Sequence, residues 1–157
     1  MVLSSVNLED MYDDQDKDLM NIAYESVKKS ASHRIDEFIS FAKKANYHKI
    51  GIAHCTSMQK YADKFARILE IHGFDVYLAD CKKDKINNCE FPSEEARIKN
   101  TPLYQAKYME KHNTDINVNI GLCLAHELIF IKKSHAPVTT ILVRDFATKH
   151  KIVEHLD

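Results

Sequence analysis

The chain has 157 residues, a length that suits one ordinary domain with its own hydrophobic core. Apolar residues make up 45% and charged residues 29% of the sequence, which is a globular composition. Lys and Arg number 22 against 23 Asp and Glu, so the chain lacks the basic excess that binds phosphate backbones, and we expect no nucleic-acid partner. Because no apolar run approaches the roughly 20 residues of a membrane span and the N-terminus is acidic, we expect a cytoplasmic protein with no membrane partner.

Apolar residues recur at helical spacing in the first part of the chain. After a polar segment over residues 1–15, this spacing predicts one helix and then a second helix over residues 32–46, with Ser32 as its N-cap. The period then changes, and short apolar runs predict buried strands at 49–55, 74–81, 116–123 and 138–144. Between the strands we expect a helix after residue 55 that is capped by Thr56 and Ser57, a polar loop over 82–100, and helices over 102–113 and 125–133.

Strands that alternate with helices are typical of a parallel sheet whose two faces are covered by right-handed crossovers. The predicted fold class is therefore α/β, a three-layer sandwich around a mainly parallel four-stranded sheet with the expected strand order 2-1-3-4. We expect residues 16–157 to form a single domain that includes the two N-terminal helices. Three Gly in the whole chain leave no Gly-rich phosphate loop, which excludes the common nucleotide-binding motifs.

Three cysteines, Cys55, Cys81 and Cys123, each end a predicted strand. The carboxyl ends of parallel strands share one sheet edge, where ligands bind, and adjacent strands lie about 4.8 Å apart. Three thiols there can share one metal, and His126 is the expected fourth ligand because a Cys-x-x-His spacing lets both side chains reach one ion. The sequence therefore predicts a Cys3His zinc site, with an iron–sulfur cluster that recruits Cys89 as the alternative.

Two other interpretations of the cysteines stay open. Cys55 and Cys123 each precede a predicted helix, where the helix dipole favours a thiolate, so either residue could be the nucleophile of an enzyme that uses His126 as acid or base. The residues after Cys55 lack the arginine of a cysteine-phosphatase loop, and Phe130 replaces the second histidine of a zinc-protease motif. In the last interpretation the cysteines are packed in the core of a non-catalytic protein that forms a homodimer through its apolar faces.

The run from Gly121 to Asp145, G-L-C-L-A-H-E-L-I-F-I-K-K-S-H-A-P-V-T-T-I-L-V-R-D, is similar to the C-terminal signature of a family of uncharacterised bacterial and archaeal proteins usually described as predicted metal-binding. The runs that end at Cys55 and Cys81 also match the pattern of this family, so the resemblance covers roughly residues 32–150. It implies a metal site and no particular reaction. The matching residues of the signature are Cys123, His126, Lys132, Ser134, Ala136, Pro137, Val138, Thr139, Asp145 and His150.

The chain departs from the pattern of this family at three places. No cysteine precedes Cys55, Asn100 stands where the family has a cysteine, and Ala125 and Glu127 replace the Gly and Asp that flank the histidine. If the usual site needs those cysteines, metal binding is weakened or changed here. Side chains that we expect to contact the metal ligands or a substrate, rather than the metal itself, are His54, Asn100, Lys132, Ser134, Asp145 and His150.

Overall fold

The computed structural model describes residues 11–29, 33–82 and 102–156, and the chain divides into two compact units, residues 1–46 and 47–157. The first unit contains α1 (Asp14–Lys29) and α2 (Arg34–Lys44). An ion pair joins the two helices, with Lys44 Nζ 2.9 Å from Glu25 Oε2. His33 occupies the N-cap position of α2 without a side-chain hydrogen bond, and the predicted cap Ser32 lies outside the described residues. The predicted domain boundary at residue 15 stays a prediction.

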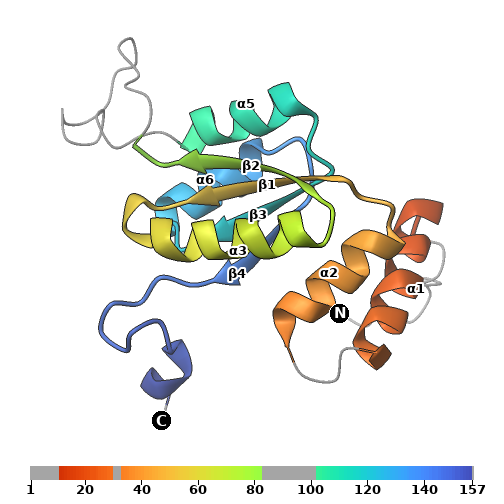
Figure 1. Cartoon of the computed structure of the whole chain (residues 1–157), viewed down its shortest axis with the longest axis horizontal. Helices are drawn as coiled ribbons and strands as arrows, with labels where there is room; N and C mark the ends of the chain where they lie inside the picture. Colours follow the sequence, from red (N-terminus) through yellow and green to blue (C-terminus); the bar gives the residue numbers. More distant parts are fainter. Residues whose placement is uncertain (1–10, 30–32, 83–101, 157) are drawn as a thin grey trace, which may run out of the picture. The chain divides into compact units, whose positions relative to one another are not determined.

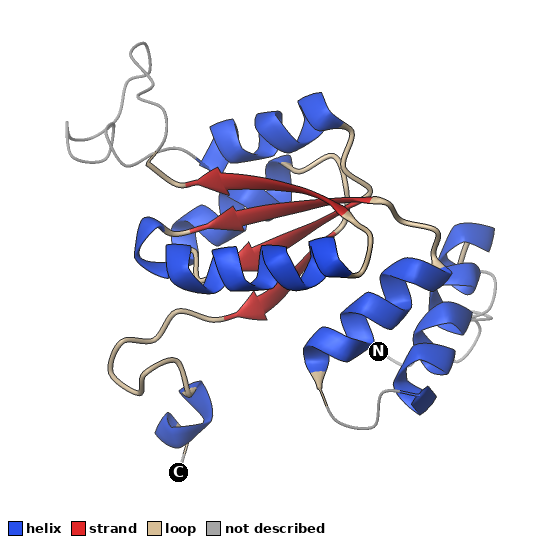
Figure 2. Cartoon of the chain, in the orientation of Figure 1, coloured by secondary structure: helices blue, strands red, loops and turns tan. Residues whose placement is uncertain are grey.

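The second unit is built on a four-stranded sheet of β1 (Lys49–His54), β2 (Asp75–Asp80), β3 (Ile116–Ile120) and β4 (Val138–Leu142). All neighbouring strands are parallel, and their order is β2-β1-β3-β4 (Figures 1 and 2). At the carboxyl edge His54 of β1 lies in register with Asp80 of β2 and Ile120 of β3. The predicted α/β class and the predicted strand order are therefore confirmed.

Helices cover both faces of this sheet. The 3-10 turn η2 (Thr56–Met58) and α3 (Gln59–Ile71) follow β1 on one face, whereas α5 (Pro102–His112) and α6 (Leu124–Lys133) pack against each other on the opposite face (Figure 1). The chain moves from β1 to β2 in one direction and from β2 through β3 to β4 in the other, and right-handed crossovers that run in opposite directions place their helices on opposite faces. The direction switches between β1 and β3, and doubly wound proteins bind ligands at the carboxyl edge near such a switch.

Alternation along the strands divides the buried side chains between the two helical layers. The layer under α5 and α6 is a core cluster of small and large apolar groups: Ala53, Ala79, Cys81, Ala106, Met109, Leu122 and Phe130. Intervening strand residues such as Ile50 and Ile52, which are fully buried, point to the α3 face. No helix in the part of the chain that the structure describes is long and apolar enough to cross a bilayer. The cytoplasmic location stays a prediction.

The strands end earlier than the apolar runs indicated. β1 ends at His54 and β3 at Ile120, so Cys55 and Cys123 lie in the turns that follow these strands. Cys55 itself occupies the N-cap position of η2, and the hydroxyls of Thr56 and Ser57 bond elsewhere, so the prediction that these two residues cap the helix was wrong. The predicted loop over 82–100 falls, apart from Lys82, outside the described residues together with Cys89 and Asn100.

Candidate functional site

Cys55 lies at the carboxyl edge of the sheet, between the neighbouring ends of β1 and β3. Its backbone N–H donates to the carbonyl oxygen of Ile120 at 3.2 Å, which continues the β1–β3 ladder by one residue. Its carbonyl oxygen accepts the N–H of Met58 at 2.8 Å, which starts η2. The half-buried thiol lies against the core cluster, with Sγ 3.1 Å from the Ser57 hydroxyl oxygen. The thiol is thus held where the strand direction switches, directly before η2.

Arg144, which follows β4, reaches across the sheet edge to this thiol. Its Nη1 donates to Cys55 Sγ at 3.7 Å, and its guanidinium carbon lies 5.4 Å from the centre of the Phe146 ring. Gly121, at φ +63°, lies beside Arg144 and Met58: a Cβ there would overlap the Met58 side chain and would lie in ordinary contact, at 3.4 Å, with the Arg144 Cβ. A cation beside a thiol near a helix N-terminus is the environment in which proteins stabilise thiolates.

Cys123 and His126 lie at the start of α6, at the same carboxyl edge of the sheet. Cys123 is the half-buried N-cap residue of α6, and its carbonyl oxygen accepts the N–H of Glu127 at 2.9 Å. Burial lowers the pKa of the half-buried His126 imidazole, and the positive charge of Arg144 lowers it further. The imidazole is therefore mainly neutral near pH 7, the form that can accept a proton.

The buried side chain of Asn119 on β3 holds the turn that carries Cys123. The side-chain oxygen of Asn119 accepts the N–H of Leu122 at 3.0 Å, and its Nδ2 donates to the Thr140 hydroxyl at 3.2 Å. That hydroxyl in turn donates to Glu127 Oε1 of α6 at 2.7 Å. The apolar run predicted only a buried strand here. These bonds join β3, β4 and the first turn of α6, so they position Cys123 before α6 and His126 in its first turn.

Cys81 is a buried member of the core cluster, with 5% of its surface exposed. Its Sγ lies 3.7 Å from the Thr56 hydroxyl oxygen, and that hydroxyl donates to Asp80 Oδ1 at 2.6 Å. Cys81 therefore packs beneath the turn after β1, where it supports Thr56.

The described residues do not present a metal-binding set. No three His, Cys, Asp or Glu side chains within residues 11–29, 33–82 and 102–156 lie close enough to hold one ion. Cys55, Cys81, Cys123 and His126 all follow strands near the carboxyl edge of the sheet. Metal binding by these residues stays a prediction.

The side chains predicted to surround the site have other contacts. Ser134 accepts a hydrogen bond from Asn117 Nδ2 at 2.6 Å and donates to a backbone carbonyl, so it closes the turn after α6. Lys132 is exposed in the last turn of α6. The Asp145 carboxylate accepts the Thr148 hydroxyl at 2.7 Å, and Asp145 N–H donates to His150 Nδ1 at 3.1 Å, which shapes the loop after β4.

Sequence reasoning missed Arg144 and assigned Ser57 another role. Arg144 was only the last residue of a predicted strand, although strand 4 ends at the same sheet edge as the cysteines. A charged residue directly after an apolar strand, at the edge where parallel strands end, is a signal that points to such a site. Ser57 was predicted to cap a helix, and its hydroxyl contacts Cys55 instead.

The fold and the site define a doubly wound α/β protein with two half-buried cysteines, a histidine and an arginine at the carboxyl edge of its sheet. The model of a family described as protein of unknown function (DUF1847) matches residues 4–141, and the chain belongs to this family. An uncharacterized protein of Methanocaldococcus jannaschii is 37% identical over 122 residues, a match that covers 74% of this chain and 63% of the relative, which is less than two thirds. The expected membership in an uncharacterised family is thus confirmed, and the metal-binding description is not.

Proposed function

We propose that the chain is an enzyme that acts on a small anionic or electrophilic molecule, with the Cys55 thiolate as its nucleophile. The observation that carries this proposal is the approach of Arg144 Nη1 to within 3.7 Å of Cys55 Sγ. The thiolate is the reactive form of cysteine, and a neighbouring cation stabilises it. Cys81 has no such partner among the described residues and is buried, so Cys55 is the better nucleophile of the two.

The surroundings of Cys55 suit an anionic group on the substrate. The helix α6 begins directly after Cys123 at the same sheet edge, and Cys55 precedes the short turn η2. Unpaired backbone N–H groups at helix starts attract anions, and the guanidinium of Arg144 adds a full positive charge. This arrangement supports binding of a carboxylate or phosphate beside the thiolate.

His126 is the proposed acid or base of the reaction. Its lowered pKa keeps the imidazole neutral near pH 7, so it can take a proton from the substrate or return one to a leaving group. The Ser57 hydroxyl, 3.1 Å from Cys55 Sγ, can donate to the thiolate and hold its orientation.

Alkylation rates test the nucleophile directly. Mass spectrometry of each cysteine peptide after timed exposure to iodoacetamide measures the rate at Cys55, Cys81 and Cys123 separately. We expect Cys55 to react fastest. A unit charge near 4 Å contributes about 1 kcal/mol at the dielectric constant of water, so we expect Arg144→Met to slow Cys55 by about fivefold or more. Arg67→Met removes an exposed arginine of α3 and serves as the control that leaves the rate unchanged.

A second reagent tests the anion site. Iodoacetate carries a carboxylate that iodoacetamide lacks, so we expect iodoacetate to react preferentially at Cys55 in the unaltered protein and to lose this preference in Arg144→Met. Equal rates at Cys55, Cys81 and Cys123, or an Arg144→Met protein that reacts like the unaltered one, would refute the proposed nucleophile.

A metal shared by Cys55, Cys81, Cys123 and His126 is a second proposal, favoured by the common position of these residues at one sheet edge. Elemental analysis and an absorption spectrum of protein purified without oxygen test it. About one zinc per chain, lost in a Cys55→Ser, Cys123→Ser double variant, supports the zinc site, and iron with charge-transfer absorption supports a cluster instead. Absence of metal from both proteins refutes this proposal and leaves the nucleophile proposal standing.

A further inference from the structure

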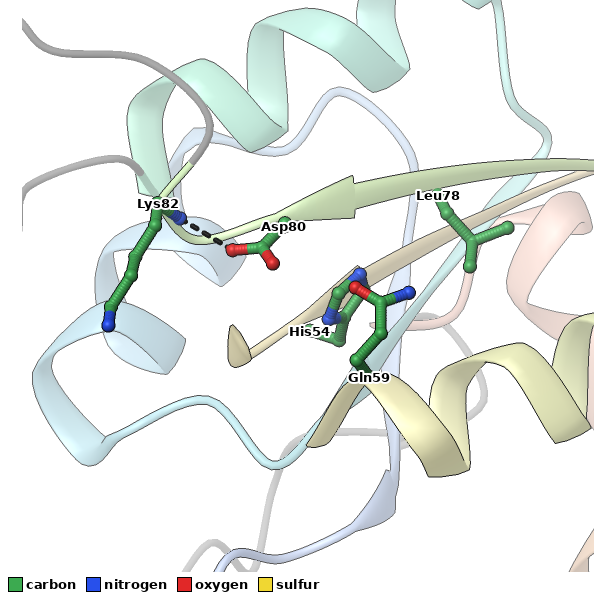
Figure 3. Close-up of a pocket in the computed structure, with 5 residues that line it drawn as sticks. All are labelled: His54, Gln59, Leu78, Asp80 and Lys82. Atoms are coloured by element: carbon green, nitrogen blue, oxygen red, sulfur yellow. Dashed lines mark hydrogen bonds between the residues drawn. The ribbon is translucent and has the colours of Figure 1, made fainter. Parts of the chain in front are cut away.

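A pocket lies at the carboxyl edge of the sheet, on the face that α3 covers. It has a volume of about 280 Å³ and is lined by His54, Gln59, Leu78, Asp80 and Lys82 (Figure 3). These residues come from the carboxyl ends of β1 and β2 and from the first turn of α3. The pocket is distinct from the thiol site, because neighbouring strand residues point to opposite faces of a sheet and the core cluster beside Cys55 lies on the α5 and α6 face.

His54 presents an unpartnered ring nitrogen to this pocket. The residue as a whole is only 1% exposed, and its Nδ1 lies 3.0 Å from the carbonyl oxygen of Cys55. A carbonyl oxygen accepts, so Nδ1 carries the hydrogen in the neutral ring and Nε2 is left with a lone pair. Nε2 has no hydrogen-bond partner among the residues that the structure describes, and it is not one of their fully buried atoms. Nε2 can therefore accept a hydrogen bond from the N–H of a ligand in the pocket.

Asp80 offers a second acceptor beside His54. Its Oδ1 accepts the Thr56 hydroxyl at 2.6 Å and the backbone N–H of Lys82 at 2.7 Å, which fixes the carboxylate in place. Its Oδ2 has no partner within the described residues. Figure 3 shows the carboxylate and the imidazole ring side by side between β2 and the start of α3. His54 and Asp80 are also direct register partners on β1 and β2.

The remaining walls carry one cation and one apolar group. Lys82 is exposed, and its ammonium group has no partner in the described part of the chain. Leu78, two residues before Asp80 on the same face of β2, supplies aliphatic surface. We propose that this pocket binds a small zwitterion of the α-amino-acid class: the ligand ammonium donates to His54 Nε2 and Asp80 Oδ2, and the ligand carboxylate pairs with Lys82.

The charges of the pocket favour a zwitterion over simpler ligands. A plain amine would leave Lys82 as an unpaired like charge, and a plain anion would face the Asp80 carboxylate. A metal ion finds two donors here, and no third His, Cys, Asp or Glu in the described residues completes a set. A ligand with both charges satisfies all three polar groups at once.

Matched ligands test the proposal on the unaltered full chain. The probes are L-leucine, 3-methylbutylamine, which lacks the carboxylate, and 4-methylpentanoate, which lacks the ammonium. Titration followed by amide chemical shifts and by calorimetry measures binding of each one. We expect saturable binding of L-leucine, with shift changes at His54, Asp80 and Lys82, and at least tenfold weaker binding of both fragments. No saturable binding of L-leucine, or equal binding of the amine, overturns the proposal.

Two variants test whether the ligand binds in this pocket. Asp80→Asn keeps an oxygen that can accept from Thr56 and from the Lys82 amide, and it converts the second carboxylate oxygen into an N–H donor, so we expect at least tenfold weaker L-leucine binding in a folded protein. Lys82→Met is expected to weaken L-leucine and leave the affinity for 3-methylbutylamine unchanged or higher. Lys60→Met, at an exposed lysine that does not line this pocket, is the control. Full affinity in Asp80→Asn overturns the assignment.

Discussion

The turn between β3 and α6 depends on the side chain of Asn119. The substitution Asn119→Ala tests this dependence. The side chain is buried, with 1% of its surface exposed. Its oxygen holds the Leu122 N–H at 3.0 Å, and its nitrogen donates to the Thr140 hydroxyl at 3.2 Å. Alanine removes both bonds and leaves the buried Leu122 N–H without its partner.

The expected loss of stability follows from these two bonds. A buried N–H that loses its acceptor costs about 1–3 kcal/mol, and a second lost hydrogen bond adds about 1 kcal/mol. Asn119→Ala is therefore expected to lower the free energy of unfolding by about 2–4 kcal/mol. Thr140→Val is the comparison variant, because it removes the Thr140 bonds to Asn119 Nδ2 and to Glu127 Oε1 and leaves the Leu122 bond intact. Since Thr140 is only half-buried, we expect this change to cost about 1–2 kcal/mol, less than Asn119→Ala.

Urea unfolding followed by circular dichroism measures both free energies, and amide hydrogen exchange reports on Leu122 itself. We expect Leu122 to lose protection in Asn119→Ala and to keep it in Thr140→Val. The reasoning fails if the two variants are equally stable, or if Leu122 stays protected without Asn119, because the amide would then have another partner.

Three further predictions concern one charge and two close approaches. Because burial and a neighbouring guanidinium lower the pKa of His126 below its ordinary 6.5, the unfolded chain binds this proton more readily than the folded one. The contribution of His126 to stability is therefore complete above about pH 6.5 and is lost as pH falls through the lower pKa of the folded state. Urea unfolding at a series of pH values measures the free energy of unfolding against pH, and we expect His126→Gln to flatten the fall of this free energy below pH 6.5. An unchanged slope in His126→Gln would contradict this prediction. A Cβ on Gly51 would overlap the side-chain oxygen of Asn117 and lie 2.5 Å from Met109 Sδ, so Gly51→Ala is expected to lower stability by about 1–3 kcal/mol in scanning calorimetry. An unchanged melting temperature would show that Asn117 and Met109 both adjust freely. Gly121→Ala places a side chain at φ +63° against Met58, so we expect about 1–2 kcal/mol of destabilisation and, through the turn that Met58 shares with Cys55, slower alkylation of Cys55. A rate equal to that of the unaltered protein would show that this glycine does not affect the thiol.

Much of the fold could be predicted because its signals are local. Apolar runs of strand length alternate with helical spacing along residues 49–144, and this alternation admits few topologies once crossovers are right-handed. The predicted order 2-1-3-4 was confirmed for this reason. The ends of the strands were less predictable, because the apolar run 116–123 continues through a turn that begins after Ile120.

Part of the candidate site was predictable for the same reason. Residues that follow parallel strands meet at one edge, so Cys55, Cys123 and His126 were expected there from their positions alone. The apolar pattern did not predict the direction in which each side chain points after its strand ends. Cys81 turned into the core cluster, and the metal site that the pattern predicted stays a prediction.

The sequence by itself determined the order of strands and helices and the edge at which the chemistry-bearing residues gather, because hydrophobic period and chain connectivity report local burial and crossover direction. Only the tertiary structure decided which of those residues touch. Arg144 lies 89 residues beyond Cys55 along the chain, and its approach depends on the sheet order and on the path after β4. The pocket at His54 likewise exists only because β1 and β2 place His54 and Asp80 in register under the start of α3.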